Sequence, residues 1–191
     1  MRVISGTAKG RRLRATKSPE MRPTTDMARQ TIFDVLGDAP NDARVLDLCA
    51  GAGTLGIEAL SRGAREAVFV EQEREACAII LQNLEATGLR SAAHIRRADV
   101  LRFLARPPRM AFDLVFLDPP YARGLGFVSR VLGKIAAGAW MSSGATVVVE
   151  APEGDVEWPR SMREIKTRRF GRTRVSWAIV GEHEGDLSGH V

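Results

Sequence analysis

The stretch "DLCAGAGTLGIEAL" (residues 47–60) decides the fold and raises the first question about the ligand. It follows an apolar run that ends at Asp47, and it contains the spacing Gly51-x-Gly53-x-x-Gly56. Glycines at this spacing, between a strand and a helix, are typical of loops that hold a dinucleotide cofactor. The stretch alone therefore predicts a nucleotide-binding α/β fold and leaves the identity of the cofactor open.

On both sides of this loop, apolar β-branched runs alternate with helical patterns. This alternation is typical of buried parallel strands joined by right-handed crossovers. The two runs that flank Gly171-Arg172 predict an antiparallel hairpin instead. We expect strands at 44–48, 67–71, 93–98, 112–118, 145–150, 163–170 and 173–180, and helices at 54–62, 74–87, from 100, and 126–137. The predicted fold is a Rossmann-like, doubly wound α/β sheet of seven strands that ends in an antiparallel C-terminal hairpin.

The first 38 residues predict a small basic extension of this fold. Runs at 2–5 and 11–15, around a glycine-containing turn, predict a hairpin with arginines on one face. Thr25 or Asp26 can cap a helix that ends near Leu36. We divide the chain into this extension (1–38), a catalytic domain (39–181) and a tail (182–191) that we expect to be disordered.

The composition is that of a globular domain. The chain has 191 residues, of which 45% are hydrophobic and 27% charged, and no apolar run is long enough to span a bilayer. The first residues lack the pattern of a signal peptide. Cys49 and Cys77 form no CxxC pair, which argues against a disulfide framework or a zinc site. We expect a monomer in the cytoplasm.

Positive charge is concentrated in two segments. Residues 1–30 carry eight Lys or Arg and two acids, and residues 160–177 carry seven and one, so each segment has a net charge of +6. Segments of this kind suit a phosphate backbone. Solvated surface explains them too, and charge alone slightly favours that second explanation.

Asp47 argues against a nicotinamide cofactor. It precedes Gly51 by four residues, where a carboxylate would repel a pyrophosphate. The same carboxylate suits a cation, and S-adenosylmethionine carries a sulfonium and an α-ammonium group. Gly51 and Gly53 would let the backbone approach the ligand and supply amide donors, and Gly56 would pack its helix against the sheet. A second interpretation, which we rank lower, makes Asp47 a structural cap of the glycine loop.

Acids also stand at the ends of the next two strands. Glu71 can accept hydrogen bonds from ribose hydroxyls in either cofactor class, so it does not discriminate between them. Asp99 can accept from an adenine amine, with Val100 against the ring, and it can also cap the helix that begins there. The two roles of Asp99 are compatible.

The segment "DPPY", Asp118 to Tyr121, ends the fourth strand and predicts the chemistry. Pro119 and Pro120 fix φ and remove two backbone donors, so the turn is rigid and its carbonyls can accept. Asp118 and the Pro119 carbonyl can hold an NH2 group, and Tyr121 can stack on a flat ring. Two acceptors push electron density onto a delocalised amine and aim its lone pair at a methyl group. This pattern predicts N-methyl transfer without a metal ion.

Together these residues resemble the RsmD family of bacterial small-subunit (16S) ribosomal RNA guanine-N2 methyltransferases, which are class I S-adenosylmethionine-dependent enzymes. The similar stretches are "RVISGTAKGRRL" (2–13), "RPTTD" (22–26), "LDLCAGAGTLGIEALSRGA" (46–64), "VE" (70–71) and "DLVFLDPPY" (113–121). The resemblance implies that "DPPY" holds the target guanine and that "RPTTD" closes over the methionine end of the cofactor. The cofactor-binding residues that it implies are Asp47, Ala50, Gly51, Gly53, Glu71, Gln72, Asp99, Val100, Thr24 and Thr25. The implied partner is ribosomal RNA within an assembling small subunit.

The chain departs from the family pattern at two places. After "RPTTD" the family usually continues Arg-x-(Arg/Lys)-Glu, whereas this chain has Met27-Ala28-Arg29-Gln30, so one charge pair is missing. Cys49 stands where an aromatic residue is common, which changes the packing behind the cofactor.

The basic extension is the expected RNA-binding surface, close to the cofactor edge. Its candidate phosphate-binding residues are Arg2, Lys9, Arg11, Arg12, Arg14 and Arg22. Three alternatives remain: the same chemistry on DNA adenine or on a protein glutamine, a non-catalytic RNA-binding module, and a nicotinamide oxidoreductase. The intact acids and "DPPY" argue against the second alternative, and the position of Asp47 argues against the third.

Overall fold

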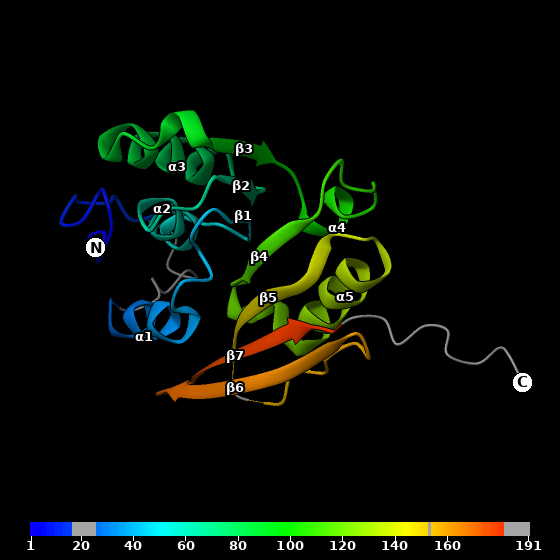
Figure 1. Cartoon of the computed structure of the whole chain (residues 1–191). Coiled ribbons are helices and arrows are strands. Elements are labelled where there is room, and N and C mark those ends of the chain that lie inside the picture. The colour runs from blue at the N-terminus through cyan, green and yellow to red at the C-terminus, as the bar shows by residue number, and fades with distance from the viewer. Residues whose placement is uncertain (17–25, 153, 182–191) are drawn as a thin grey trace, which may run out of the picture.

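The computed structural model describes residues 1–16, 26–152 and 154–181, which build one mixed sheet of seven strands with helices on both faces (Figure 1). The strand order is β3-β2-β1-β4-β5-β7-β6, as predicted for a doubly wound sheet. The strands are β1 (Arg44–Leu48), β2 (Glu66–Glu71), β3 (Ala93–Arg97), β4 (Phe112–Leu117), β5 (Met141–Pro152), β6 (Met162–Phe170) and β7 (Thr173–Val180). The α-helices are α1 (Asp26–Leu36), α2 (Thr54–Ser61), α3 (Arg74–Thr87), α4 (Val100–Phe103) and α5 (Gly124–Ala137).

Strands β1 to β5 pair in parallel, and β5-β7-β6 pair antiparallel. The central strands β1 and β4 are buried on both faces, and apolar side chains occupy three of five positions in β1 and five of six in β4. Helices α1, α2 and α3 cover one face, and α4 and α5 cover the other (Figure 1). Phe33 of α1 packs on Phe116 of β4, with ring centroids 5.7 Å apart. The carboxyl ends of the parallel strands therefore form one edge between two helical layers.

Most element boundaries lie within one or two residues of the sequence prediction, and strand β5 is the main exception. Helix α3 ends at Gly88, which has the left-handed φ of 76° that a helix-terminating glycine supplies. Helix α5 begins at Gly124, two residues before the predicted start. Strand β5 continues to Pro152 because its antiparallel pairing with β7 extends to Thr173.

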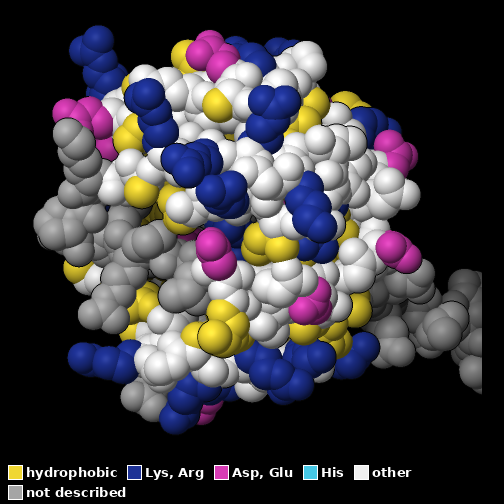
Figure 2. All heavy atoms as spheres, turned by 90° about the vertical axis from the view of Figure 1, so that its left-hand side faces the viewer, with side chains coloured by type: hydrophobic (Ala, Val, Ile, Leu, Met, Phe, Trp, Pro, Cys, Tyr) yellow, Lys and Arg dark blue, Asp and Glu magenta, His cyan; other side chains and the backbone are white. Residues whose placement is uncertain are grey.

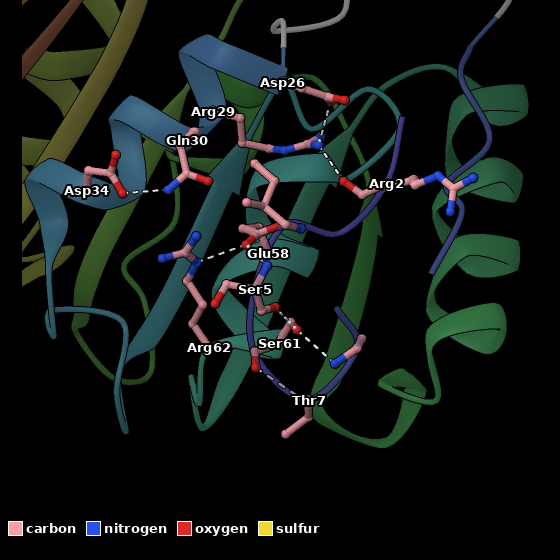
Figure 3. Close-up of polar contacts among 12 residues, drawn as sticks. Arg2, Ser5, Thr7, Asp26, Arg29, Gln30, Asp34, Glu58, Ser61 and Arg62 are labelled. Atoms are coloured by element: carbon pink, nitrogen blue, oxygen red, sulfur yellow. Dashed lines mark hydrogen bonds and ion pairs between the residues drawn. The ribbon is translucent and has the colours of Figure 1, made fainter. Parts of the chain in front are cut away.

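Residues 1–16, here called the strap, form a looser structure than the predicted hairpin. The only bridge between its two legs is Arg2–Arg12, and Val3 N donates to Arg11 O at 3.0 Å. The strap lies on α2, whose polar side chains satisfy its backbone. Both carboxylate oxygens of Glu58 accept backbone N–H groups, from Ile4 at 2.8 Å and Ser5 at 3.0 Å (Figure 3).

Buried polar groups hold the strap in place. Glu58 and Ser61 are each about 1% exposed, and Ser61 Oγ accepts from Ala8 N at 2.9 Å. Arg29 of α1 is fully buried and donates to the carbonyl of Arg2 and to Asp26. Because buried polar groups are costly without partners, these contacts specify one position for the strap.

Several sequence predictions lie outside the described residues, namely those for Arg22, Thr24, Thr25 and the tail 182–191. None of the helices in the described ranges is long and apolar enough to cross a bilayer.

Candidate active site

A pocket opens at the carboxyl ends of β1, β2 and β4 and encloses about 720 Å³ of empty space, open solvent included. It is lined by Cys49, Val70, Glu71, Gln72, Glu73, Ala98, Asp99, Val100, Asp118, Pro120, Arg123 and Phe127. Six predicted site residues therefore meet in one cavity: Glu71, Gln72, Asp99, Val100, Asp118 and Pro120.

The glycine loop turns tightly beside this pocket. Cys49, Gly51 and Gly53 all have positive φ, of 60°, 55° and 77°. The N–H of Gly51 donates to Glu71 Oε2 at 2.8 Å, and the N–H of Gly53 donates to Ala50 O at 2.7 Å. Both hydrogen bonds lie within the protein and shape the turn. That these amides serve a ligand stays a prediction.

Gly56 packs α2 against the sheet, as predicted. A Cβ at Gly56 would lie 2.4 Å from the Phe69 ring of β2, so only glycine allows this approach. Asp47 Oδ2 accepts from the Gly56 N–H at 2.9 Å, and Asp47 is about 1% exposed and outside the pocket lining. This hydrogen bond is the one expected if Asp47 is a structural cap of the glycine loop. The sequence analysis ranked that interpretation lower. A contact of Asp47 with the cofactor stays a prediction.

Burial raises the pKa of Asp47 to about 8, although the Gly56 hydrogen bond lowers it, and the Glu71 charge raises it further. A carboxyl whose pKa is raised in the folded state contributes stability at low pH and loses it as the pH rises toward the folded pKa. We expect the free energy of unfolding to fall with pH between about 4 and 8 through this group, by about 1.4 kcal/mol per pH unit at most.

Asp47→Asn is the matched variant, because its amide oxygen can still accept from Gly56 while no longer titrating. We expect its stability to fall less steeply than that of the wild type from pH 5 to pH 8. Urea unfolding at four pH values checks this, and identical slopes for the two proteins would show that Asp47 is ionised in the fold.

Acidic side chains line the part of the pocket at the ends of β2 and β3. Glu71 is nearly buried, and its carboxylate accepts from Gly51 N and from Glu73 N at 2.9 Å. Asp99 caps α4 through a 3.1 Å hydrogen bond from Arg102 N, as one of its two predicted roles required. A carboxylate oxygen has two lone pairs, so both acids can still accept from a ligand.

Arg123 and Phe127 are pocket residues that sequence reasoning missed. Arg123 Nη2 lies 3.3 Å from Gln72 Oε1 and 3.9 Å from Asp99 Oδ2, so it reaches across the pocket. Its guanidinium also lies 4.8 Å from the centre of the Phe127 ring. Arg123 lies before the predicted start of α5 at residue 126, and Phe127 lies inside that helix, where an apolar residue is expected in the core. The short distance of both from "DPPY" was the signal that could have found them.

Residues 118–121 connect the pocket to the C-terminal hairpin. Asp118 N donates to Leu48 O at 3.4 Å, which joins the ends of β4 and β1. Asp118 and Pro120 line the pocket, whereas Pro119 and Tyr121 do not. The Tyr121 hydroxyl instead forms a hydrogen bond with the Thr173 side chain at the start of β7. The hairpin therefore fixes the side chain that is predicted to stack on the target.

Known proteins share this sequence and this arrangement. A family model described as "Conserved hypothetical protein 95" matches residues 1–179. "Ribosomal RNA small subunit methyltransferase D" of Escherichia coli (strain K12) is 36% identical over 151 residues, which are 79% of this chain and 74% of that protein. The chain belongs to the RsmD family. A Haemophilus influenzae protein of the same name is 33% identical over 152 residues and 78% of each chain.

Solved structures agree with the RsmD assignment. The structure described as "Putative methyltransferase yhhF from Escherichia coli" has a TM-score of 0.86 at 30% identity, and the match covers 95% of this chain and 98% of that one. An "RNA methyltransferase from Salinibacter ruber in complex with S-Adenosyl-L-homocysteine" has a TM-score of 0.66 at 16% identity, covering 88% and 100%. This second likeness shows the fold alone, which is that of class I methyltransferases.

The structure shows the contacts of the two residues, Gln30 and Cys49, that depart from the RsmD pattern. Gln30 donates to Asp34 Oδ1 at 2.6 Å, so a neutral donor stands where the family has a charged side chain (Figure 3). Cys49 lines the pocket, and burial raises the pKa of its thiol, with the Glu71 and Asp118 charges adding to this effect. The thiol therefore stays neutral and acts as a small apolar wall.

The predicted RNA-binding residues of this RsmD-family chain do not all lie near the pocket. Arg14 does, because its backbone N donates to Asn83 Oδ1 at 2.8 Å, and Asn83 in turn donates to Ala52 of the glycine loop. Lys9 does not. Its turn contacts Ser61 at the other end of α2, which is about 12 Å long for eight residues. The prediction that the whole extension lies at the cofactor edge is therefore wrong for this turn.

Proposed function

We propose that this protein uses S-adenosylmethionine to methylate the exocyclic N2 amine of a guanine in small-subunit (16S) ribosomal RNA. The observation that carries the proposal is the position of Asp118 and Pro120 in the same pocket as Glu71 and Asp99. Membership of the RsmD family and the name of the Escherichia coli relative support ribosomal RNA as the substrate. Residues 118–121 suit a planar amine, and the membership of the RsmD family favours guanine over adenine or glutamine.

The residues present fit S-adenosylmethionine. A carboxylate at the end of the second strand, Glu71, suits ribose hydroxyls, and Asp99 with Val100 suits an adenine. Gly51 and Gly53 adopt the left-handed backbone conformation that shapes this loop beside the pocket, which glycine permits without strain. The bound cofactor supplies a methyl group on positively charged sulfur. Within the described residues, no group of three or more His, Cys, Asp and Glu side chains is arranged to hold a metal ion.

The protein's own residues would activate the amine by holding it. Asp118 and the carbonyl of Pro119 accept its two hydrogens, which turns the lone pair toward the methyl group. Pro119 and Pro120 bring no N–H that could compete for these acceptors. Tyr121, held by Thr173, would stack on the guanine ring. Because a paired guanine hides this amine, the target base must be unpaired or extruded.

The test uses purified protein, tritiated S-adenosylmethionine and three acceptors: small subunits from a strain that lacks this activity, bulk DNA, and protein extract. We expect label in N2-methylguanosine after digestion of the small-subunit RNA to nucleosides. Label in DNA or in protein would keep the chemistry and overturn the substrate. Absence of transfer to all three, together with binding of S-adenosylhomocysteine, would favour a non-catalytic binding module.

This proposal implies ribosomal RNA within an assembling small subunit as the partner, and therefore a cytoplasmic site of action. We expect the enzyme to act as a monomer.

A further inference from the structure

Three basic side chains form a row on one face of β6, and we call Arg163, Lys166 and Arg168 the β6 row. Their partners across the ladder are Ile179, Trp177 and Val175 of β7. Directly opposed residues share a face of a sheet, and Trp177 and Val175 belong to the core on the α1 side. A register shift between Glu164 and Lys166 keeps all three basic residues on that face. The β6 row thus lies on the same side of the sheet as the strap and α1.

The charges of the β6 row have no acidic partner within the described residues. Arg163 and Arg168 are exposed and Lys166 is half-buried. In the described structure, Arg168 donates one side-chain hydrogen bond, to the carbonyl of Thr167. The opposite face of the hairpin is different, because Arg174 there pairs with Asp155 and lies 3.9 Å from Glu164. A structural ion-pair network therefore accounts for Arg174 and leaves the β6 row available to an external anion.

The β6 row leads to the predicted target site. Arg168 is two residues, or about 7 Å along a strand, from Phe170. Phe170 pairs with Thr173, whose side chain bonds Tyr121. The row extends about 16 Å from Arg168 to Arg163 along the edge strand. A polyanion lying along it would therefore end beside residues 118–121.

Figure 2 shows Lys and Arg side chains gathered in two groups on this face. One group lies over the upper half, where the strap, α2 and α3 lie in Figure 1, and the other lies low, at the height of β6 and β7. The first 30 residues and residues 160–177 each carry a net charge of +6, whereas the rest of the chain is acidic on balance. A row of cations without acidic partners suits a phosphate backbone, whose charges repeat along its length.

We propose that the β6 row binds the phosphates of the RNA that flanks the target base. This inference rests on the proposed function for its ligand. The hairpin then serves two purposes at once, because it holds the RNA backbone through the row and holds Tyr121 through Thr173. The strap near Arg14 contacts the RNA on the other side of the pocket.

The test compares two triple variants that remove the same charge. The first is Arg163→Gln, Lys166→Gln and Arg168→Gln. The matched control is Arg106→Gln, Arg109→Gln and Arg130→Gln, which neutralises exposed arginines in the α4–β4 loop and on α5. Binding of purified small subunits and of deproteinised 16S ribosomal RNA is measured over a series of salt concentrations. Circular dichroism and S-adenosylhomocysteine binding report the fold and the cofactor site.

We expect the β6-row variant to bind both RNA probes at least about tenfold more weakly in 0.1 M salt. The magnitude of the slope of log K against log salt should decrease by about 2, because three phosphate contacts are lost. The control should retain the wild-type slope, and cofactor binding should be unchanged in both. Equal weakening by the control, or an unchanged slope in the β6-row variant, would overturn the inference. An effect on subunits but not on deproteinised RNA would assign the row to a protein partner and also overturn it.

The failure of this inference is distinguishable from failure of the proposed function. If the wild type methylates small-subunit RNA while the β6-row variant binds it normally, only the assignment of the row is wrong. If the wild type binds the RNA through the row but transfers no methyl group to it, the row stands and the proposed reaction is wrong.

Discussion

Asp118→Ala is expected to reduce methyl transfer to small-subunit RNA by about 10²–10³-fold, the usual cost of removing a group that stabilises charge in a transition state. Asp118 lines the pocket at the end of β4, where one of the two acceptors for the target amine is needed. The cofactor acids Glu71 and Asp99 are untouched, so affinity for S-adenosylhomocysteine should change less than threefold or so. Single-turnover methylation and calorimetric binding of S-adenosylhomocysteine measure the two quantities separately.

Asp118→Asn is the matched variant for this experiment. Its amide oxygen can accept one amine hydrogen but carries no full negative charge, so we expect activity between those of the alanine variant and the wild type. If activity falls in the order wild type, Asp118→Asn, Asp118→Ala, while binding of S-adenosylhomocysteine is retained, then Asp118 acts on methyl transfer and not on the fold. Turnover of Asp118→Ala close to the wild-type value would refute the role given to residues 118–121.

Gly6→Ala is expected to destabilise the protein by about 3 kcal/mol or more, because the added carbon overlaps backbone that cannot move aside. A Cβ at Gly6 would lie 1.7 Å from the carbonyl oxygen of Ser61, and Gly6 also has a φ of 79°. Either the strap leaves α2 or the end of α2 must shift. Urea unfolding gives the loss of stability, and limited trypsin digestion at Arg11 and Arg12 shows whether the strap has come free.

Gly10→Ala is the control that separates the clash from backbone strain. Gly10 has nearly the same φ, 81°, but a Cβ there meets no atom within 4 Å. Its substitution should cost only the strain of a left-handed alanine, about 1–2 kcal/mol. If the two variants lost the same stability and were digested at the same rate, the tight contact between strap and α2 would not exist in solution.

The fold was predictable because local sequence patterns indicate each strand and helix and the order in which they alternate. The β-branched runs around Val45 and Val148 could only be buried strands, and Gly88 marked the end of α3 to the residue. The strap was harder, since its backbone partners are side chains more than 50 positions away, such as Glu58 and Ser61. No periodicity within the strap predicts such contacts. The predicted hairpin is present only as a single bridge between Arg2 and Arg12.

The pocket was predictable only in part, for a similar reason. Strand-end acids such as Glu71 and Asp99 could be placed because topology brings the ends of parallel strands to one edge. The reach of Arg123 across the pocket depends on side-chain geometry that sequence does not display. The burial of Asp47 and its hydrogen bond to Gly56 likewise depend on how α2 packs on β2.

The outer strands of the sheet, β3 and β6, leave one side of each backbone without a strand partner in the described structure. Unprotected edges of this kind invite pairing between molecules and aggregation, and charged side chains are a common defence. Both edges carry exposed arginines, Arg96 and Arg97 on β3 and Arg163 and Arg168 on β6. Basic residues at these edges therefore oppose strand pairing between two molecules, which is a second physical reason for positive charge on β6 besides the proposed RNA contact.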